Sequence, residues 1–135
     1  MNYAAESATG VTPTGLIVRL YETMIADLGR AITAVRDGNV ERRTFELQHA
    51  LAIIGHLQGA LDMNRGGDPA ILLDRFYSLA RSRIFNSQLY QTAKPLEELM
   101  RDLILLRDVW MEVEKSQALP TPPSGEPHNS SNWVA

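Results

Sequence analysis

Residues 12–38 read TPTGLIVRLYETMIADLGRAITAVRDG, and this stretch contains the start, the apolar face and the end of one long helix. Thr12 and Pro13 predict the start, because a threonine hydroxyl caps free backbone N–H groups and a proline fits the first helical position. Apolar residues then recur every three or four positions, as one face of an α-helix requires. They are Ile17, Leu20, Met24, Leu28, Ala31 and Val35. Asp-Gly-Asn at 37–39 predicts the end near residue 36, since glycine tolerates the left-handed conformation found there.

Two further stretches follow the same pattern after short breaks. The second covers residues 40–64, and the third begins after Arg-Gly-Gly, with Asp68 as its expected cap and Pro69 in its first position. Residues 86–93 are weakly patterned and are expected to be part helix end and part loop.

The fourth stretch runs to about residue 116, with Thr92 as its expected cap and Pro95 in its first turn. Its apolar residues keep the heptad spacing typical of helical bundles. They are Leu96, Leu99, Leu103, Leu106, Trp110 and Val113. Because short connections favour antiparallel neighbours, the sequence predicts an all-α fold, an antiparallel up-and-down four-helix bundle.

The chain divides into three parts. Residues 1–11 are expected to be a flexible arm, and residues 12–116 the bundle domain. Residues 117–135 are rich in proline and serine and are expected to be a disordered tail. Trp133 in that tail is either a short docking element or a passenger.

Composition excludes several classes of protein. At 135 residues the chain is expected to be one domain, and it has no cysteine, so neither disulfides nor thiolate metal sites are available. A net charge of −3 without a basic stripe argues against nucleic acid as a partner. The first residues do not resemble a signal peptide and the apolar runs are too short for membrane insertion, so we expect a cytoplasmic protein.

No group of residues suggests an enzyme or a cofactor site. Glu46 and His49 have the Glu-x-x-His spacing of di-iron bundles, but such sites need the motif twice with further inward carboxylates. The pair is therefore interpreted as exposed and polar, and no metal is expected. His56 lies one heptad after His49 and loosely resembles the phosphoacceptor of histidine phosphotransfer domains, although the lysine that follows it there is absent. A phosphotransfer domain or another helical adaptor remains the alternative function.

The third stretch carries more apolar surface than a closed bundle needs. One of its two stripes contains Leu72, Phe76 and Leu79, and the other contains Leu73, Tyr77, Ala80 and Ile84. Together they exceed the face of roughly 100° that packs in a bundle. The surplus indicates either a partner groove or a wide core. Gly55 and Gly59, costly in a helix, indicate either a close approach of a neighbour or simple tolerance.

Four groups of residues share their order with one known family. They are Thr12-Pro13 with Leu16-Ile17 and Leu20-Tyr21-Glu22; Ala50, Ile53-Ile54, Leu57 and Leu61-Asp62; Gly66-Gly67-Asp68 with Leu73 and Phe76-Tyr77; and Leu106-Arg107 with Trp110. Their order and spacing over most of the chain resemble the flagellar secretion chaperone family, FliS. The chain departs from the family pattern at Pro69, Phe76 and Phe85, and in its Pro-rich tail.

The resemblance implies a flagellar export chaperone that works without nucleotide or metal. Its client would be the C-terminal segment of flagellin, held in apolar grooves so that subunits neither polymerise nor aggregate before type III secretion. The chaperone would be a monomer or weak homodimer, with flagellar export gate components or a regulator as further partners. The expected partner-binding residues are Leu16, Leu20, Tyr21, Leu57, Leu61, Leu72, Leu73, Phe76 and Tyr77. Tyr3 in the arm would cover the empty groove.

Overall fold

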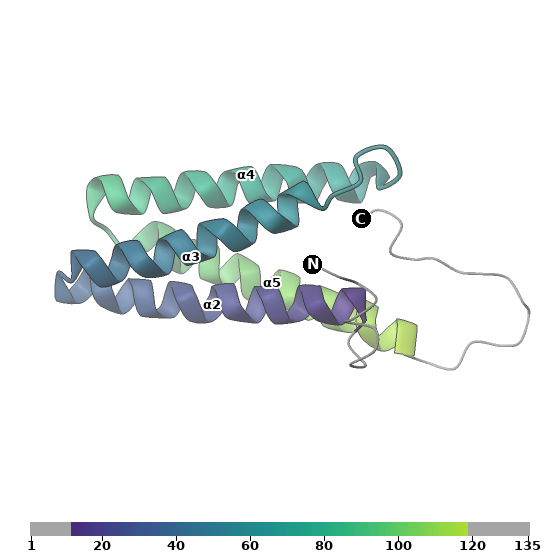
Figure 1. Ribbon diagram of the computed structural model, residues 1–135, viewed down its shortest axis with the longest axis horizontal. Helices are drawn as coiled ribbons and strands as arrows, with labels where there is room; N and C mark the ends of the chain where they lie inside the picture. The colour runs from purple at the N-terminus through teal and green to yellow at the C-terminus, as the bar shows by residue number, and fades with distance from the viewer. Residues whose placement is uncertain (1–11, 119–135) are drawn as a thin grey trace, which may run out of the picture.

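The computed structural model describes residues 12–118, so Tyr3, Trp133 and the remainder of the expected arm and tail lie outside the described residues. The chain forms α2 (Pro13–Asp37), α3 (Val40–Gly59), α4 (Gly67–Tyr90) and α5 (Lys94–Ala118). Consecutive helices run in opposite directions, and α5 returns to lie beside α2 (Figure 1). The predicted antiparallel four-helix bundle is confirmed. None of these four helices combines the length and apolar content that crossing a membrane requires.

The ends of α2 follow the sequence signals. Thr12 is the N-cap, and its hydroxyl oxygen accepts a hydrogen bond from the backbone N–H of Gly15 at 2.9 Å. Pro13 occupies the first helical position. Gly38 adopts the left-handed conformation with a φ of 69°, and Asn39 then caps α3. The predicted start and end of this helix are confirmed.

The connection between α3 and α4 differs from the prediction. Helix α3 ends at Gly59 rather than near residue 64. The Asp62 carboxylate accepts hydrogen bonds from the backbone N–H groups of Asn64 and Arg65, at 3.1 and 2.9 Å. An aspartate that bonds the backbone two and three residues ahead stabilises a turn in competition with the helix. The periodic apolar pattern continues past this turn, which is why the sequence predicted too long a helix.

Helix α4 also begins and ends differently. Its N-cap is Gly66, whose lack of a side chain leaves no capping hydrogen bond, and Asp68 lies inside the first turn. The expected Asp68 cap was therefore wrong, although a carboxylate in the first turn still interacts favourably with the helix dipole. The helix continues to Tyr90 and closes on Gln91, which is left-handed with a φ of 50°. Most of the weakly patterned residues 86–93 are thus helical.

Helix α5 starts at Lys94, with Pro95 in its first turn as predicted. The hydroxyl oxygen of Thr92 lies 3.5 Å from the backbone N of Lys94, which is long for a capping hydrogen bond. The backbone carbonyl of Thr92 accepts a hydrogen bond of 2.7 Å from the Ser87 hydroxyl, and this bond holds Thr92 in place.

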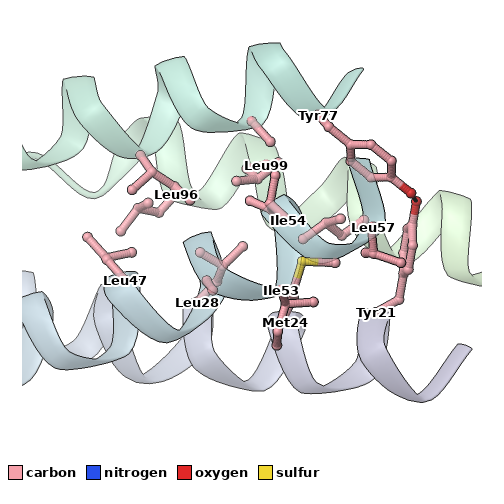
Figure 2. Packing of buried hydrophobic residues seen from close by; sticks show 14 of the residues in the cluster. Tyr21, Met24, Leu28, Leu47, Ile53, Ile54, Leu57, Tyr77, Leu96 and Leu99 are labelled. Atoms are coloured by element: carbon pink, nitrogen blue, oxygen red, sulfur yellow. Dashed lines mark hydrogen bonds between the residues drawn. The ribbon is translucent and has the colours of Figure 1, made fainter. Parts of the chain in front are cut away.

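The core runs the length of the bundle between the four helices. Figure 2 shows side chains from α2 and α3 interlocking with Leu96, Leu99 and other residues of α5 and α4. Helix α2 packs closely on both α3 and α5, whereas α4 packs less closely on its two neighbours. The helix with surplus apolar surface is therefore also the helix that is held least tightly.

Candidate partner-binding surface

The two apolar stripes of α4 have different environments. The stripe that contains Leu73, Tyr77 and Ile84 is buried in the core. In the other stripe Leu72 is 63% exposed and Leu79 is 46% exposed, and the ring of Phe76 between them is half-buried. The surplus apolar surface inferred from the sequence is thus present as a face of α4 that the bundle does not cover.

Helix α5 supplies the other half of this surface. Arg83 of α4 and Asp102 of α5 form an ion pair of 2.6 Å, which shows the register of the two antiparallel helices at this point. Phe76 lies seven residues before Arg83 and Val109 seven residues after Asp102, so each shares a helical stripe with one member of the pair. Apolar residues of both helices therefore follow one line from the ion pair toward the start of α4 and the end of α5.

We call this line the α4–α5 seam. It consists of Leu72, Phe76 and Leu79 of α4, and Leu105, Val109 and Val113 of α5. Leu105 is 61% exposed and Val109 is 57% exposed, while Val113 is half-buried against the core. Isolated exposed apolar residues are ordinary, but a contiguous row across two helices is typical of a binding surface.

The expected partner-binding residues gather at one end of the bundle, where α2 and α4 begin and α3 and α5 end (Figure 1). Leu72 is exposed, whereas Leu16, Leu20, Leu61 and Phe76 are half-buried. Tyr21, Leu57, Leu73 and Tyr77 are buried core residues. These last four side chains lie beneath the surface and support it, but they are not accessible to a partner in this structure.

Tyr21 and Tyr77 link α2 and α4, two helices whose backbones do not approach each other closely. Their phenol oxygens lie 2.7 Å apart, and Figure 2 shows the two rings reaching toward each other from α2 and α4. Burial raises the pKa of both phenols, because removal from water disfavours the charged phenolate. Hydrogen bonds from Tyr77 and Trp110 oppose part of the increase in the pKa of Tyr21. Both phenols are therefore neutral hydrogen-bonded groups of the core.

The α5 residues of the seam, Leu105 and Val109, were missed by the sequence reasoning. They lie outside the heptad positions that define the core stripe of this helix, and a single exposed leucine or valine carries no signal by itself. Leu105 and Val109 follow Asp102 by three and seven residues. Their place beside α4 can be inferred only once Asp102 is known to pair with Arg83 of α4.

The interpretation of Glu46 and His49 as an exposed pair is wrong for Glu46 but holds for His49, whose side chain is 53% exposed. Glu46 is buried, and so is Asp27 of α2. Arg30 donates to Asp27 at 2.8 Å and to Glu46 at 2.7 Å, and the ring Nδ1 of His49 lies 2.6 Å from Asp27. Arg42 is a second cation beside Glu46, at 3.7 Å. The pairing crosses from α2 to α3, which the pattern of one helix cannot show.

The positive charge between the two buried carboxylates of this network is the guanidinium of Arg30. The Arg30 guanidinium bridges the two buried carboxylates, and the Glu46 carboxylate is the main reason that the pKa of Arg30 is raised. Within residues 12–118 no group of three or more His, Cys, Asp or Glu side chains could hold a metal ion. The network therefore serves to join α2 to α3.

The two glycines of α3 and His56 have different environments. A Cβ atom added at Gly55 would lie 3.2 Å from the tip of the flexible, exposed Arg81 side chain of α4, which can move by a few tenths of an ångström, so this contact does not require a glycine. A Cβ atom at Gly59 would meet nothing within 4 Å, so this glycine is simply tolerated. His56 is exposed on α3, and its ring makes no hydrogen bond or ion pair with the described residues.

Comparison with known proteins agrees with the resemblance. Residues 1–117 match the family model "Flagellar protein FliS". The flagellar secretion chaperone FliS of Campylobacter jejuni is 26% identical over 117 residues, which cover 87% of this chain and 91% of that protein. The FliS of Salmonella typhimurium is 28% identical, over 82% of this chain and 83% of that protein. The flagellar secretion chaperone FliSB of Pseudomonas aeruginosa is 29% identical, over 73% of this chain and 78% of that protein.

Proposed function

Because this chain belongs to the FliS family, whose members above are flagellar secretion chaperones, we propose that it binds the C-terminal segment of flagellin in the bacterial cytoplasm. Binding would keep flagellin subunits from polymerising or aggregating before type III secretion. The observation that carries this proposal is the α4–α5 seam, an uncovered apolar row shared by α5 and by α4, the least tightly packed helix.

The shape and chemistry of the seam support a helical client. An amphipathic segment that is disordered before binding can lay an apolar stripe into a row of side chains with the same helical spacing. The seam offers side chains from two antiparallel helices, so a client helix can pack between them. Since the client must lose conformational freedom on binding, its affinity is moderate for the area buried. Moderate affinity suits a chaperone that must release its client for export.

The residues expected from the sequence divide into two roles in this proposal. Leu72 and Phe76 contact the client in the seam, and the half-buried side chains of Leu16, Leu20 and Leu61, at the same end of the bundle, contact a part of the client that extends beyond the seam. The buried residues Tyr21, Leu57, Leu73 and Tyr77 hold the helices beneath that surface. The chaperone acts as a monomer or a weak homodimer.

Substitutions on the seam test this proposal against the rest of the surface. Leu72→Ser and Val109→Ser should each weaken binding of a flagellin C-terminal peptide by about 1 kcal/mol or more, because truncating an interface anchor typically has an effect of this size. Both side chains are more than half exposed, so the melting temperature should change little. Calorimetric titration measures the affinity.

Phe45→Ser is the matched control. Phe45 is 65% exposed and lies on α3, near the opposite end of the bundle. Peptide binding should be unchanged in this variant. Equal losses of affinity from Phe45→Ser and Leu72→Ser, or no loss from either seam substitution, would place the client elsewhere.

A further inference from the structure

The α4–α5 seam lies at the end of the bundle from which the C-terminal segment of the chain leaves. Helix α5 ends at Ala118, and the seam begins five residues into α4 at this same end (Figure 1). Trp133 lies fifteen residues after Ala118, where the described residues end. We propose that residues 119–135 fold back and place Trp133 on the α4–α5 seam, as an occupant from the same chain.

Chain length permits this placement. With a rise of about 1.5 Å per helical residue, Val109 lies about 14 Å along α5 from Ala118, and Leu105 about 20 Å. A flexible segment of fifteen residues has a root-mean-square span of about 21 Å, and an extended one reaches about 50 Å. The segment is therefore long enough for Trp133 to reach any part of the seam. The opposite end of the bundle, where α5 begins at Lys94, is about 36 Å away, so its effective concentration of tail is lower.

The tail has a composition suited to a linker with one anchor. Residues 119–135 include four prolines, at positions 120, 122, 123 and 127, followed by polar residues up to Trp133-Val134. Proline restricts the unbound segment, so less conformational entropy is lost when it docks. Tryptophan supplies a large apolar area at a small cost in side-chain freedom, which a row of leucine and valine side chains can cover.

Arg75 adds a second complementary feature. It lies three residues after Leu72 and four residues before Leu79, so it shares their face of α4. Its side chain is exposed, and none of the carboxylates among residues 12–118 pairs with it. A guanidinium beside an apolar row is a favourable neighbour for an indole, which attracts cations over its ring face. No aromatic side chain of the described residues is stacked on Arg75.

The fluorescence of Trp133 tests docking directly, without any client. The emission of the full chain minus that of the Trp133→Ala variant isolates Trp133, because Trp110 is buried in the core and common to both. A synthetic peptide of residues 119–135 provides the free reference. Docking predicts emission at shorter wavelength than the peptide and weaker quenching by iodide, both independent of protein concentration. Leu72→Asp and Val109→Asp in the full chain should restore the peptide spectrum, and Phe45→Asp should not.

Three results would overturn the proposal. The first is a Trp133 spectrum in the full chain that equals that of the free peptide. The second is a shifted spectrum that depends on protein concentration, which would indicate docking on a second copy. The third is a shifted spectrum that the two seam substitutions leave unchanged, which would place Trp133 on another surface.

If the tail occupies the seam, a client must displace it, and this consequence rests on the proposed function. Trp133→Ala should then tighten binding of the flagellin peptide about threefold if the tail covers the seam about two-thirds of the time, because affinity scales with the fraction of chains that are free to bind. Equal affinity of the two chains would overturn competition between tail and client. A complete lack of peptide binding would instead refute the proposed function, while the fluorescence result would still decide whether the tail docks.

Discussion

Tyr21 and Tyr77 illustrate how single residues hold α4 in this bundle. Their hydrogen bond links α2 to α4 across the core, and the ring of Tyr77 also contacts Phe76 edge-on at a centroid distance of 5.8 Å. Phe76 belongs to the seam, so the buried pair lies directly beneath the proposed binding surface. The pair therefore connects the stability of the bundle with the geometry of its uncovered face.

Removing one hydroxyl of this pair should be costly. Tyr77→Phe removes one hydrogen bond of the buried Tyr21 phenol, which keeps its bond with Trp110, and the loss of one such hydrogen bond costs about 0.5–1.5 kcal/mol. The free energy of unfolding, measured by urea denaturation, should fall by this amount. In the double variant Tyr21→Phe/Tyr77→Phe both polar groups are gone, so the total loss should be smaller than the sum of the single losses. Additive losses would show that the hydrogen bond contributes nothing.

The same two phenols predict a loss of stability in alkaline solution. Burial raises the pKa of Tyr21 and Tyr77 in the folded protein, whereas tyrosines of the unfolded chain lose their proton near pH 10. A raised folded pKa means that the stabilising contribution is complete below about pH 10 and declines as the pH rises above it. The urea midpoint should therefore fall above pH 10, and less steeply in Tyr77→Phe. Identical slopes in the two proteins would contradict this assignment.

The limits of sequence reasoning are clearest at the residue scale. Glu46 was expected to be exposed together with His49, but only His49 is exposed. Their partners Asp27 and Arg30 lie in another helix, sixteen to twenty-two residues away in the sequence. Nothing in the periodicity of α2 or α3 indicates which charged residues face each other. Burial of a paired charge is decided by the packing of two helices and is therefore invisible until both are placed.

At the scale of the element, the helix starts differ in how they are capped. Thr12 caps α2 with a hydrogen bond of 2.9 Å, whereas Thr92 lies 3.5 Å from the backbone N that it would cap in α5. Thr12→Ala should lower the free energy of unfolding by about 1 kcal/mol, the usual contribution of an N-cap. Thr92→Ala is the matched control and should have a smaller effect. Equal losses in chemical denaturation would show that the difference in geometry has no energetic consequence.

The sequence predicted the helices better than their junctions. Start and end signals placed α2 correctly because threonine, proline and glycine act locally there. They failed around residues 60–68, where the turn depends on Asp62 and the cap is a glycine with no side-chain signal. The surplus stripe of α4 was predicted from its width and is confirmed. Its counterpart on α5 could not be predicted, since it depends on the register of the two helices, which only the structure shows.

On the scale of the whole molecule, the bundle has a tightly packed side and a loosely packed side. Helix α2 with α3 and α5 forms the tight side, and the Asp27–Arg30–Glu46 network reinforces it. Helix α4 lies against this unit with an apolar face still uncovered. This division lets the bundle remain folded while one surface stays available to a client, as a chaperone requires.

Calorimetric titration of the full chain with the flagellin C-terminal segment tests client binding most directly. Saturable binding of one segment per chain is expected, with a negative change in heat capacity because apolar surface is buried. The Leu72→Ser variant should weaken that binding, and Phe45→Ser should leave it unchanged. No heat at high concentration, with the chain shown to be folded and the segment soluble, would contradict flagellin as the client.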